Sequence, residues 1–391
     1  MEVEPIYLDY QATTPVDRRV VDAMLPYFTE FYGNPHAEEH LHGQKAAKGV
    51  EDARSQVARL VGALPREILF TSGATEANNI IISGIAAWLR TKRRAHLVTT
   101  TIEHKAVLKV FEKLADLGHE VTFLDVNDNG FVELDRLAGA IRDDTGLVSV
   151  MAANNEIGVL QPISDIGRLC ASRGILFHTD AAQAAGKIDI DVNGSNVDFL
   201  SISAHKLYGP KGIGAAFVRK KYVRHVEAVY SGGGQELGLR PGTIPTPLCV
   251  GFGLACEIAE ASMKQEERRY AAYRTRFLKS LRDAEVEFEV NGDLTRRLAG
   301  NLNVSFTGVD AEALLMAVRS SISIATGSAC NANTLEPSHV LQALGFGLDR
   351  CESAVRIGFG RMTTDNEVVQ AANALIEAVR NLRKFHYSIP A

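Results

Sequence analysis

Long apolar runs are missing from this sequence. None of its uninterrupted hydrophobic stretches approaches the roughly 20 residues that a helix needs to span a bilayer. The chain begins Met1-Glu2-Val3-Glu4-Pro5, and this acidic start, which leads straight into a predicted strand, has none of the features of a signal peptide. We therefore predict a cytoplasmic protein with no membrane partner.

An excess of charge of one sign is missing as well. The formal net charge is −5, which is mild for 391 residues. Direct binding of nucleic acid or of an anionic membrane usually needs a strongly basic surface. The charge balance therefore gives no support to either as the main partner.

Cysteines are few, and their arrangement excludes two roles. The five are odd in number and show no metal-ligand spacing, so we predict neither a disulfide framework nor a metal site. Cys249 and Cys256 lie in an apolar stretch, where cysteine acts as a small hydrophobic residue. Cys170 and Cys351 are expected in or beside helices, with structural roles. This usage fits a reducing compartment and leaves Cys330 as the unusual one.

The length of the chain predicts two domains. At 391 residues it exceeds the usual size of a single hydrophobic core. A hydrophobic content of 46% and a charged content of 23% are ordinary for a globular protein. We predict a large domain at residues 15–258 and a small domain that joins residues 1–14 to 259–391 and carries Cys330.

Short β-branched runs alternate with longer helical patterns from about residue 68 onward. The alternation, with nearly continuous apolar strands, predicts an α/β fold: a mostly parallel seven-stranded sheet with helices on both faces. Ligands bind at the carboxyl ends of such strands. The expected strands are 68–71, 96–100, 120–124, 147–151, 175–178, 199–202 and 213–218, with helices such as 103–117 and 164–172 between them.

The last third of the chain has a different pattern. A long charged helix is expected from about 254 to 284, followed by strands near 301–306 and 353–359 and a final helix near 365–383. This mixture predicts a smaller α+β domain. The N-terminal strand near residues 7–10 is expected to join it.

Lys206 lies in a short polar loop, Ser203 to Gly212, between two apolar runs. A lysine at the end of a strand is where pyridoxal 5′-phosphate (PLP) would form a Schiff base. Taken alone, Lys206 could equally be a solvated loop lysine. The interpretation therefore depends on what the neighbouring strand ends supply.

Residues at three other strand ends could bind the remaining groups of PLP. The segment 71–79 follows a strand and opens a helix whose free N–H groups suit a phosphate, although a Ser/Thr-capped turn is the simpler alternative. Asp180 could pair with a pyridine nitrogen and Gln183 with a phenolic oxygen, unless Asp180 merely caps a helix. His104 could stack on a planar cofactor and carry protons, unless it is a surface residue.

Cys330 lies among residues with almost no side chain, Gly327 to Asn333. Such a loop suits a nucleophile that must move. A buried structural cysteine, the alternative, would be expected in an apolar run. Together with Lys206, Cys330 indicates chemistry on an amino acid that ends in sulfur transfer.

This combination resembles the class V aminotransferase-like branch of fold-type I PLP enzymes, and within it the cysteine desulfurases of the IscS/NifS type. The resemblance covers essentially the whole chain and implies the fold-type I architecture. Its most specific segments are Thr71 to Glu76, Asn154 to Gly158, Ser203 to Gly212, Gly327 to Cys330 and Leu335 to Ser338.

The resemblance also implies a role for each site residue. Lys206 would hold PLP, with His104 stacked on the ring, Asp180 on the pyridine nitrogen and Gln183 on the phenolic oxygen. Thr243 would come from a neighbouring subunit, which implies a homodimer. The residues expected at the phosphate are Ala74, Thr75, Ser203, His205 and that Thr243. Those expected at the substrate are Asn155, Arg356 and Asn34.

The implied reaction converts L-cysteine to L-alanine. Lys206 would remove the Cα proton, and the thiolate of Cys330, with His104 as a nearby base, would attack the substrate sulfur and become a persulfide. The sulfur would pass to an acceptor protein such as an iron–sulfur scaffold. Sulfur modification of tRNA or DNA through partner proteins would need the same enzyme and stays open.

Two rival functions remain at this stage. Selenocysteine cleavage or another reaction of class V PLP enzymes uses the same fold, although transamination leaves Cys330 unexplained. A catalytically inactive scaffold belongs to a different class of protein. Loss of Lys206 or Cys330 would have indicated it, and the sequence retains both.

Overall fold

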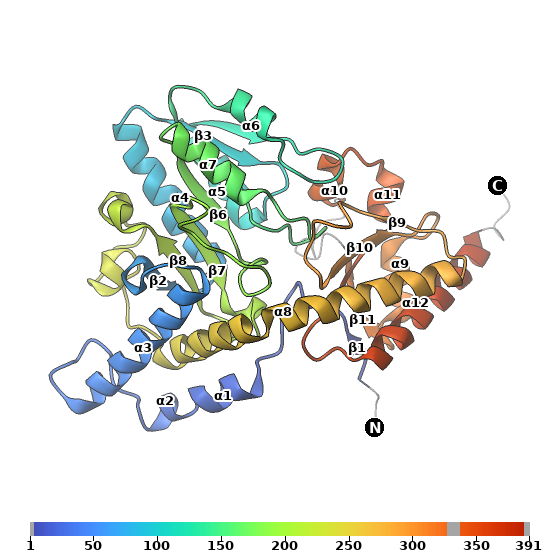
Figure 1. Cartoon of the computed structure of the whole chain (residues 1–391), viewed down its shortest axis with the longest axis horizontal. Helices are drawn as coiled ribbons and strands as arrows, with labels where there is room; N and C mark the ends of the chain where they lie inside the picture. The colour runs from blue at the N-terminus through green and yellow to red at the C-terminus, as the bar shows by residue number, and fades with distance from the viewer. Residues whose placement is uncertain (1–3, 327–336, 387–391) are drawn as a thin grey trace.

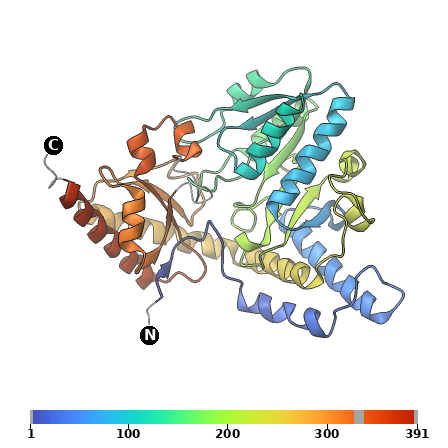
Figure 2. The same ribbon diagram turned by 180° about the vertical axis from the view of Figure 1, so that it is seen from behind.

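The computed structural model describes residues 4–326 and 337–386, in two bodies bridged by one long helix, α8 (Thr246–Asp283) (Figures 1 and 2). The larger body holds the main sheet, and the smaller one holds both chain ends. Cys330 lies outside the described residues. Within them, no helix is long and apolar enough to cross a membrane.

The main sheet has seven strands in the order β2-β8-β7-β6-β5-β3-β4. Only β8 runs antiparallel to its neighbours, β2 and β7. The other paired strands are parallel, so the prediction of a mostly parallel seven-stranded sheet is confirmed. The strands are β2 (Ile68–Thr71), β3 (His96–Thr100), β4 (Glu120–Leu124), β5 (Thr145–Ser149), β6 (Leu176–Asp180), β7 (Phe199–Ser203) and β8 (Gly214–Val218).

Helices cover both faces of this sheet because successive strand residues point to opposite sides. Phe70 and Phe177 belong to one buried cluster, and Leu69 and Leu176 belong to another. Burying each such side chain stabilises the fold by about 1.5–3 kcal/mol. The first cluster is closed by α3 (Leu41–Leu60), α6 (Leu134–Ala140), α7 (Ile163–Ser172) and α8, and the second by α4 (Ala74–Thr91) and α5 (Lys105–Asp116).

The smaller body contains an antiparallel sheet in the order β12-β13-β10-β9 and a third buried cluster. The N-terminal strand β1 (Ile6–Tyr7) pairs with β11 (Ile322–Ser323) and so joins this body. The remaining elements of this body are β9 (Glu289–Val290), β10 (Asn301–Ser305), β12 (Ala325–Thr326), β13 (Ala354–Gly358), α9 (Ala311–Val318), α10 (His339–Ala343), α11 (Leu348–Glu352) and α12 (Asp365–His386).

The predicted start of the long helix near residue 254 was wrong. Helix α8 begins at Thr246, and its first turns bury Cys249, Phe252 and Cys256 in the core of the large body. Packing, rather than the charged pattern used for the prediction, decides this boundary. The helix crosses residue 258 without a break, so the predicted domain division there stays a prediction.

Strands β5 and β6 are shifted by about two residues from their predicted bounds. Met151 leaves the sheet because its N–H bonds to the Glu103 carboxyl instead of to a strand.

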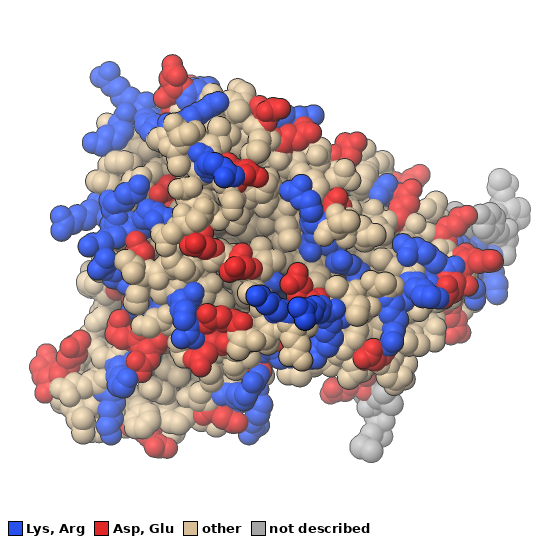
Figure 3. All heavy atoms as spheres, viewed as in Figure 1, with Lys and Arg blue, Asp and Glu red and all other residues tan. Residues whose placement is uncertain are grey.

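The two short helices α1 (Arg18–Met24) and α2 (Pro26–Thr29) lie against α8. Figure 3 shows acidic and basic side chains interspersed over most of one face, in line with the small net charge.

A buried ion pair holds the loop that precedes α8. The Arg54 guanidinium on α3 makes two contacts of 2.8 Å with the Glu236 carboxylate, which also accepts the Phe70 N–H at 2.6 Å. The Arg54 and Glu236 side chains are only 11% and 2% exposed. Glu236 and Leu237 have φ of 46° and 59°, a left-handed conformation that costs a non-glycine residue about 1–3 kcal/mol. The ion pair therefore offsets backbone strain in this loop.

Glu236→Gln should lower the free energy of unfolding by about 3–5 kcal/mol, because it leaves the buried Arg54 cation with only the exposed Glu51 carboxylate, 3.0 Å from its Nε. Urea unfolding followed by circular dichroism measures this loss. The matched control is Glu260→Gln, which removes the partner of Arg59 at 2.7 Å in a pair whose side chains are 54% and 42% exposed. That change should cost less than about 1 kcal/mol. Equal losses in both variants would contradict the structural role of the buried pair.

Candidate active site

A cavity of about 550 Å³ lies where the carboxyl ends of the sheet strands face the smaller body. Parallel strands end at the same edge of a sheet, so loops far apart in sequence meet there. The cavity brings together ten of the predicted residues: Ala74, Thr75, His104, Asn155, Asp180, Gln183, Ser203, His205, Lys206 and Arg356. Cys330 lies outside the described part of the chain.

Two predicted residues do not line this cavity. Asn34 is exposed, and its side chain accepts the N–H of His36 instead. Thr243 is exposed in the loop before α8. Within one chain, neither residue reaches the cofactor or substrate position that the resemblance implies.

Lys206 ends a short 3₁₀ helix, Ala204–Lys206, directly after β7. Its ammonium donates to the carbonyl oxygens of Gln11 and Ala12, each at 2.6 Å. The alternative of a solvated loop lysine is therefore wrong. The N-terminal segment holds the amine at the end of the sheet, where it faces the cavity.

The N-terminus of α4 has no side-chain cap. The N-cap position is Gly73, which offers no side-chain oxygen, and the Thr71 hydroxyl donates to the Gly73 carbonyl instead of capping the helix. The alternative of a Ser/Thr-capped turn is therefore wrong. An 18-residue helix that starts without a cap presents N–H groups and the positive end of its dipole to the cavity, which favours an anion such as phosphate.

The charge around the cavity also favours an anion. Burial and the nearby cations Lys206, Lys211 and Lys187 together lower the pKa of His205 to about 4, so its imidazole is neutral near pH 7. The His205 Nδ1 lies 3.1 Å from the Thr13 hydroxyl. A phosphate would be attracted by these lysines and by the end of α4 together.

Asp180 is buried at the end of β6, and its two oxygens have different partners. One accepts the Ala182 N–H at 2.9 Å, and the other accepts the Asn78 amide at 2.8 Å. The Ala182 bond is local, whereas Asn78 belongs to α4, and Asp180 caps no α-helix. The carboxylate is thus held in one orientation at the cavity wall, as a partner for a protonated ring nitrogen must be.

His104 is the N-cap of α5, and its Nδ1 accepts the Ala106 N–H at 3.1 Å. Burial lowers the pKa of the imidazole, so the ring is neutral and carries its proton on Nε2. The alternative of an ordinary surface histidine is wrong, since the ring lines the cavity. Next to it, burial raises the pKa of Glu103 to about 8, which keeps that carboxyl protonated near pH 7.

Arg356 and Asn155 lie together on the side of the smaller body. The Arg356 guanidinium donates to the Asn155 carbonyl at 3.0 Å and to the Asp9 carboxylate at 2.9 Å. Arg356 therefore makes a structural ion pair with Asp9. The Arg356 Nε is buried and has no hydrogen-bond partner among the described residues, and Arg356 lines the cavity.

Sequence reasoning missed several residues of the site. Asn78 lies inside a segment already singled out, four residues into α4, and could have been found by helical spacing. Gln11 and Ala12 act through backbone oxygens, which leave no trace in side-chain patterns. Asp9 and Glu103 reach the site through packing between the two bodies and between strands, which the local sequence does not show.

The residues that line the cavity fit PLP. They provide an amine for the aldehyde, a carboxylate for the ring nitrogen, an amide for the phenolic oxygen, a flat neutral ring and an uncapped helix end for the phosphate. Among the described residues, no group of three or more His, Cys, Asp or Glu side chains is placed to hold a metal ion.

Comparison with known proteins gives a consistent result. The description "Aminotransferase class-V" belongs to the family model that matches residues 6–370. A curated relative named cysteine desulfurase IscS, from Rickettsia conorii, is 49% identical over 380 residues, which cover 97% of this chain and 92% of the relative.

Solved structures show the same fold. A NifS-like protein superposes with a TM-score of 0.89 at 34% identity and covers 97% of this chain and 100% of its own. SspA, solved in complex with cysteine, superposes with a TM-score of 0.79 at 40% identity and covers 90% of this chain and 98% of its own. The fold-type I architecture inferred from the motifs is therefore confirmed.

Proposed function

Because the chain belongs to the aminotransferase class-V family and is a PLP-dependent cysteine desulfurase, we propose that it passes sulfur from L-cysteine to an acceptor protein through a persulfide on Cys330. The observation that carries this proposal is the convergence of ten predicted residues, from separate strand-end loops and from β13, on one cavity. The cysteine complex of SspA supports cysteine as the substrate.

The overall chemistry needs no external oxidant. The Cβ–S bond of L-cysteine breaks, a bond forms between that sulfur and the Cys330 sulfur, and protons complete L-alanine. Bound PLP supplies an electron sink that stabilises negative charge at Cα. The remaining work belongs to the side chains that hold the substrate and move protons.

Lys206 is the residue we assign to proton transfer at Cα. Lys206 lies just after β7, and two carbonyl oxygens hold its amine. The amine therefore stays at the cofactor position while the substrate reacts. Arg356 and the side chain of Asn155 would bind the substrate carboxylate from the opposite wall. With the cofactor on one side of the substrate and its carboxylate bound on the other, the Cα–H bond would be oriented toward Lys206.

His104 exchanges protons through one nitrogen only. Its Nδ1 is occupied by the Ala106 N–H, so any proton passed to or from the substrate or a thiol must use Nε2. Burial keeps the ring neutral near pH 7. We therefore assign His104 to stacking on the cofactor and to hydrogen-bond donation from Nε2.

We propose a homodimer in which Thr243 reaches the phosphate site of the neighbouring subunit. Thr243 is exposed and does not line the cavity of its own chain. Large apolar side chains that are more than half exposed support an interface: Phe28 (57%), Tyr32 (65%), Leu41 (61%) and Leu237 (60%).

We propose iron–sulfur cluster assembly in the cytoplasm as the destination of the sulfur. The IscS-type relative supports the pathway. The four described cysteines are all free and buried, which supports a reducing compartment. A scaffold protein for iron–sulfur clusters would then accept the persulfide sulfur.

The experiment that tests this function uses the purified chain loaded with PLP. Sedimentation should give twice the chain mass of 42.4 kDa. With L-cysteine and a thiol acceptor, the enzyme should release one alanine for each sulfur transferred, and a persulfide label should appear on the peptide that contains Cys330. Selenocysteine as the preferred substrate, or pyruvate as the product, would contradict the proposal.

A further inference from the structure

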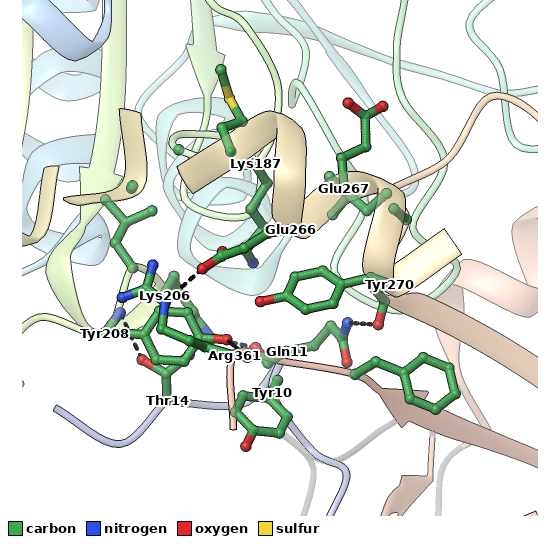
Figure 4. Close-up of a pocket in the computed structure, with 18 residues that line it drawn as sticks. Tyr10, Gln11, Thr14, Lys187, Lys206, Tyr208, Glu266, Glu267, Tyr270 and Arg361 are labelled. Carbon is green, nitrogen blue, oxygen red and sulfur yellow. Dashed lines mark hydrogen bonds and ion pairs between the residues drawn. The ribbon is translucent and has the colours of Figure 1, made fainter. Parts of the chain in front are cut away.

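Lys206 also borders a second, smaller cavity of about 40 Å³ (Figure 4). Helix α8 contributes Glu266 and Tyr270 to it, and the N-terminal segment contributes Gln11. Figure 4 shows the side chain of Lys187 reaching into this space toward Glu266. Nothing in the proposed reaction uses Lys187.

Lys187 lies four residues after Gln183, in the turn that follows β6. Its ammonium donates to the side-chain oxygen of Gln183 at 3.2 Å. The NH₂ group of the same amide donates to the Gln11 carbonyl at 2.9 Å. Lysine can only donate and a carbonyl can only accept, so these two partners allow one orientation of the amide.

The allowed orientation is the one the cofactor needs. The Gln11 carbonyl that receives the Gln183 NH₂ also receives the Lys206 ammonium, at 2.6 Å. The donor end of the amide is therefore on the side of Lys206, where the phenolic oxygen of PLP would lie. A rotated amide would turn its oxygen toward that oxygen, and the two would repel each other.

The charges around Lys187 come from several elements. Burial, together with the cations Lys206 and Arg356 and against the opposing Glu266 on α8, lowers the pKa of Lys187 to about 7. Glu266 already pairs with Arg361 at 2.6 Å. The charged form of Lys187 can only donate, so it is the ammonium that fixes the side-chain oxygen of Gln183 toward Lys187.

We propose, as an extension of the function given above, that Lys187 is a positioning residue of the cofactor site, which fixes the amide of Gln183 with its NH₂ group toward the phenolic oxygen of PLP. The role combines two observations: the donor–acceptor chain Lys187–Gln183–Gln11 and the shared carbonyl that joins this chain to Lys206.

The test follows the absorbance of bound PLP as a function of pH. Without Lys187, the amide can rotate, the phenolic oxygen loses its donor, and the protonated form of the cofactor is favoured. Lys187→Met should therefore raise the midpoint of the absorbance change by about one pH unit. Lys187→Arg, which keeps a donor, should restore most of the shift. If Lys187→Met does not fold, Lys187→Leu, which also lacks a donor, carries the same test.

A double-variant comparison separates this route from a general structural effect. In a Gln183→Met background, Lys187→Met should shift the midpoint by much less, because the amide is gone. An unchanged midpoint in Lys187→Met, or an equal shift in both backgrounds, would overturn the positioning role. If the wild-type chain takes up no PLP, both the proposed function and this role fail. Normal PLP uptake with an unchanged midpoint rejects Lys187 alone.

Discussion

Lys206→Ala should lower the turnover of L-cysteine at least about 10³-fold and abolish the absorbance that PLP shows when it is linked to a lysine. The amine is held by the carbonyls of Gln11 and Ala12 at the end of β7, so no other described lysine occupies the same place. Alanine removes both the cofactor linkage and the group that moves the Cα proton.

The measurements are an absorbance spectrum of the PLP-loaded variant and an alanine assay. Lys113→Ala is the matched control, because Lys113 is an exposed lysine on the outer surface of α5. It should keep the spectrum and the rate of the wild type. Wild-type turnover by Lys206→Ala would reject both the linkage and the proton-transfer role.

Cys330→Ser should still bind PLP and cysteine but should form no persulfide, and alanine release should fall at least about 10²-fold. A serine hydroxyl is a poor nucleophile toward sulfur, whereas a thiolate is a good one. The described cysteines cannot replace it. Burial raises the pKa of Cys170 to about 12, and it raises the pKa of Cys249, Cys256 and Cys351 as well, so all four remain neutral thiols near pH 7.

The matched control is Cys351→Ala, which removes one of these neutral thiols. It should keep persulfide formation and turnover. Mass spectrometry of the enzyme after a single turnover shows which cysteine gains a sulfur atom. An added sulfur on Cys351 or Cys170, or wild-type alanine release by Cys330→Ser, would show that Cys330 is not the nucleophile.

Prediction from the sequence worked where a signal is local. The strands β2, β3 and β4 match their predicted bounds, because β-branched and large apolar residues recur within each of them. It failed at the start of α8, where burial of Cys249 and Phe252 in the core extends the helix by two turns. A hydrophobic run does not show by itself whether it forms a strand or the buried part of a helix.

The same contrast applies to the site. Lys206, Asp180, Gln183 and His104 could be chosen from the sequence because each follows a strand and carries suitable chemistry. The alternatives for Lys206 and His104 were excluded only by structure, since burial and hydrogen-bond partners decide whether a strand-end residue faces solvent or a cavity. Asn34 and Thr243 stand outside the cavity of their own chain, and a single sequence contains no information on which subunit a residue serves.

By itself, the sequence determined the alternation of strands and helices, the chemical types at the strand ends and the separate small-residue loop of Cys330, because these depend on local order along the chain. Only the tertiary structure decided that backbone oxygens of residues 11 and 12 hold Lys206, that Asn78 holds Asp180, and that Lys187 holds Gln183. The first two of these contacts join residues that are 102 or more positions apart. Lys187 and Gln183 are only four residues apart, but the orientation of the Gln183 amide also depends on the Gln11 carbonyl. Only the tertiary structure brings that carbonyl to Gln183.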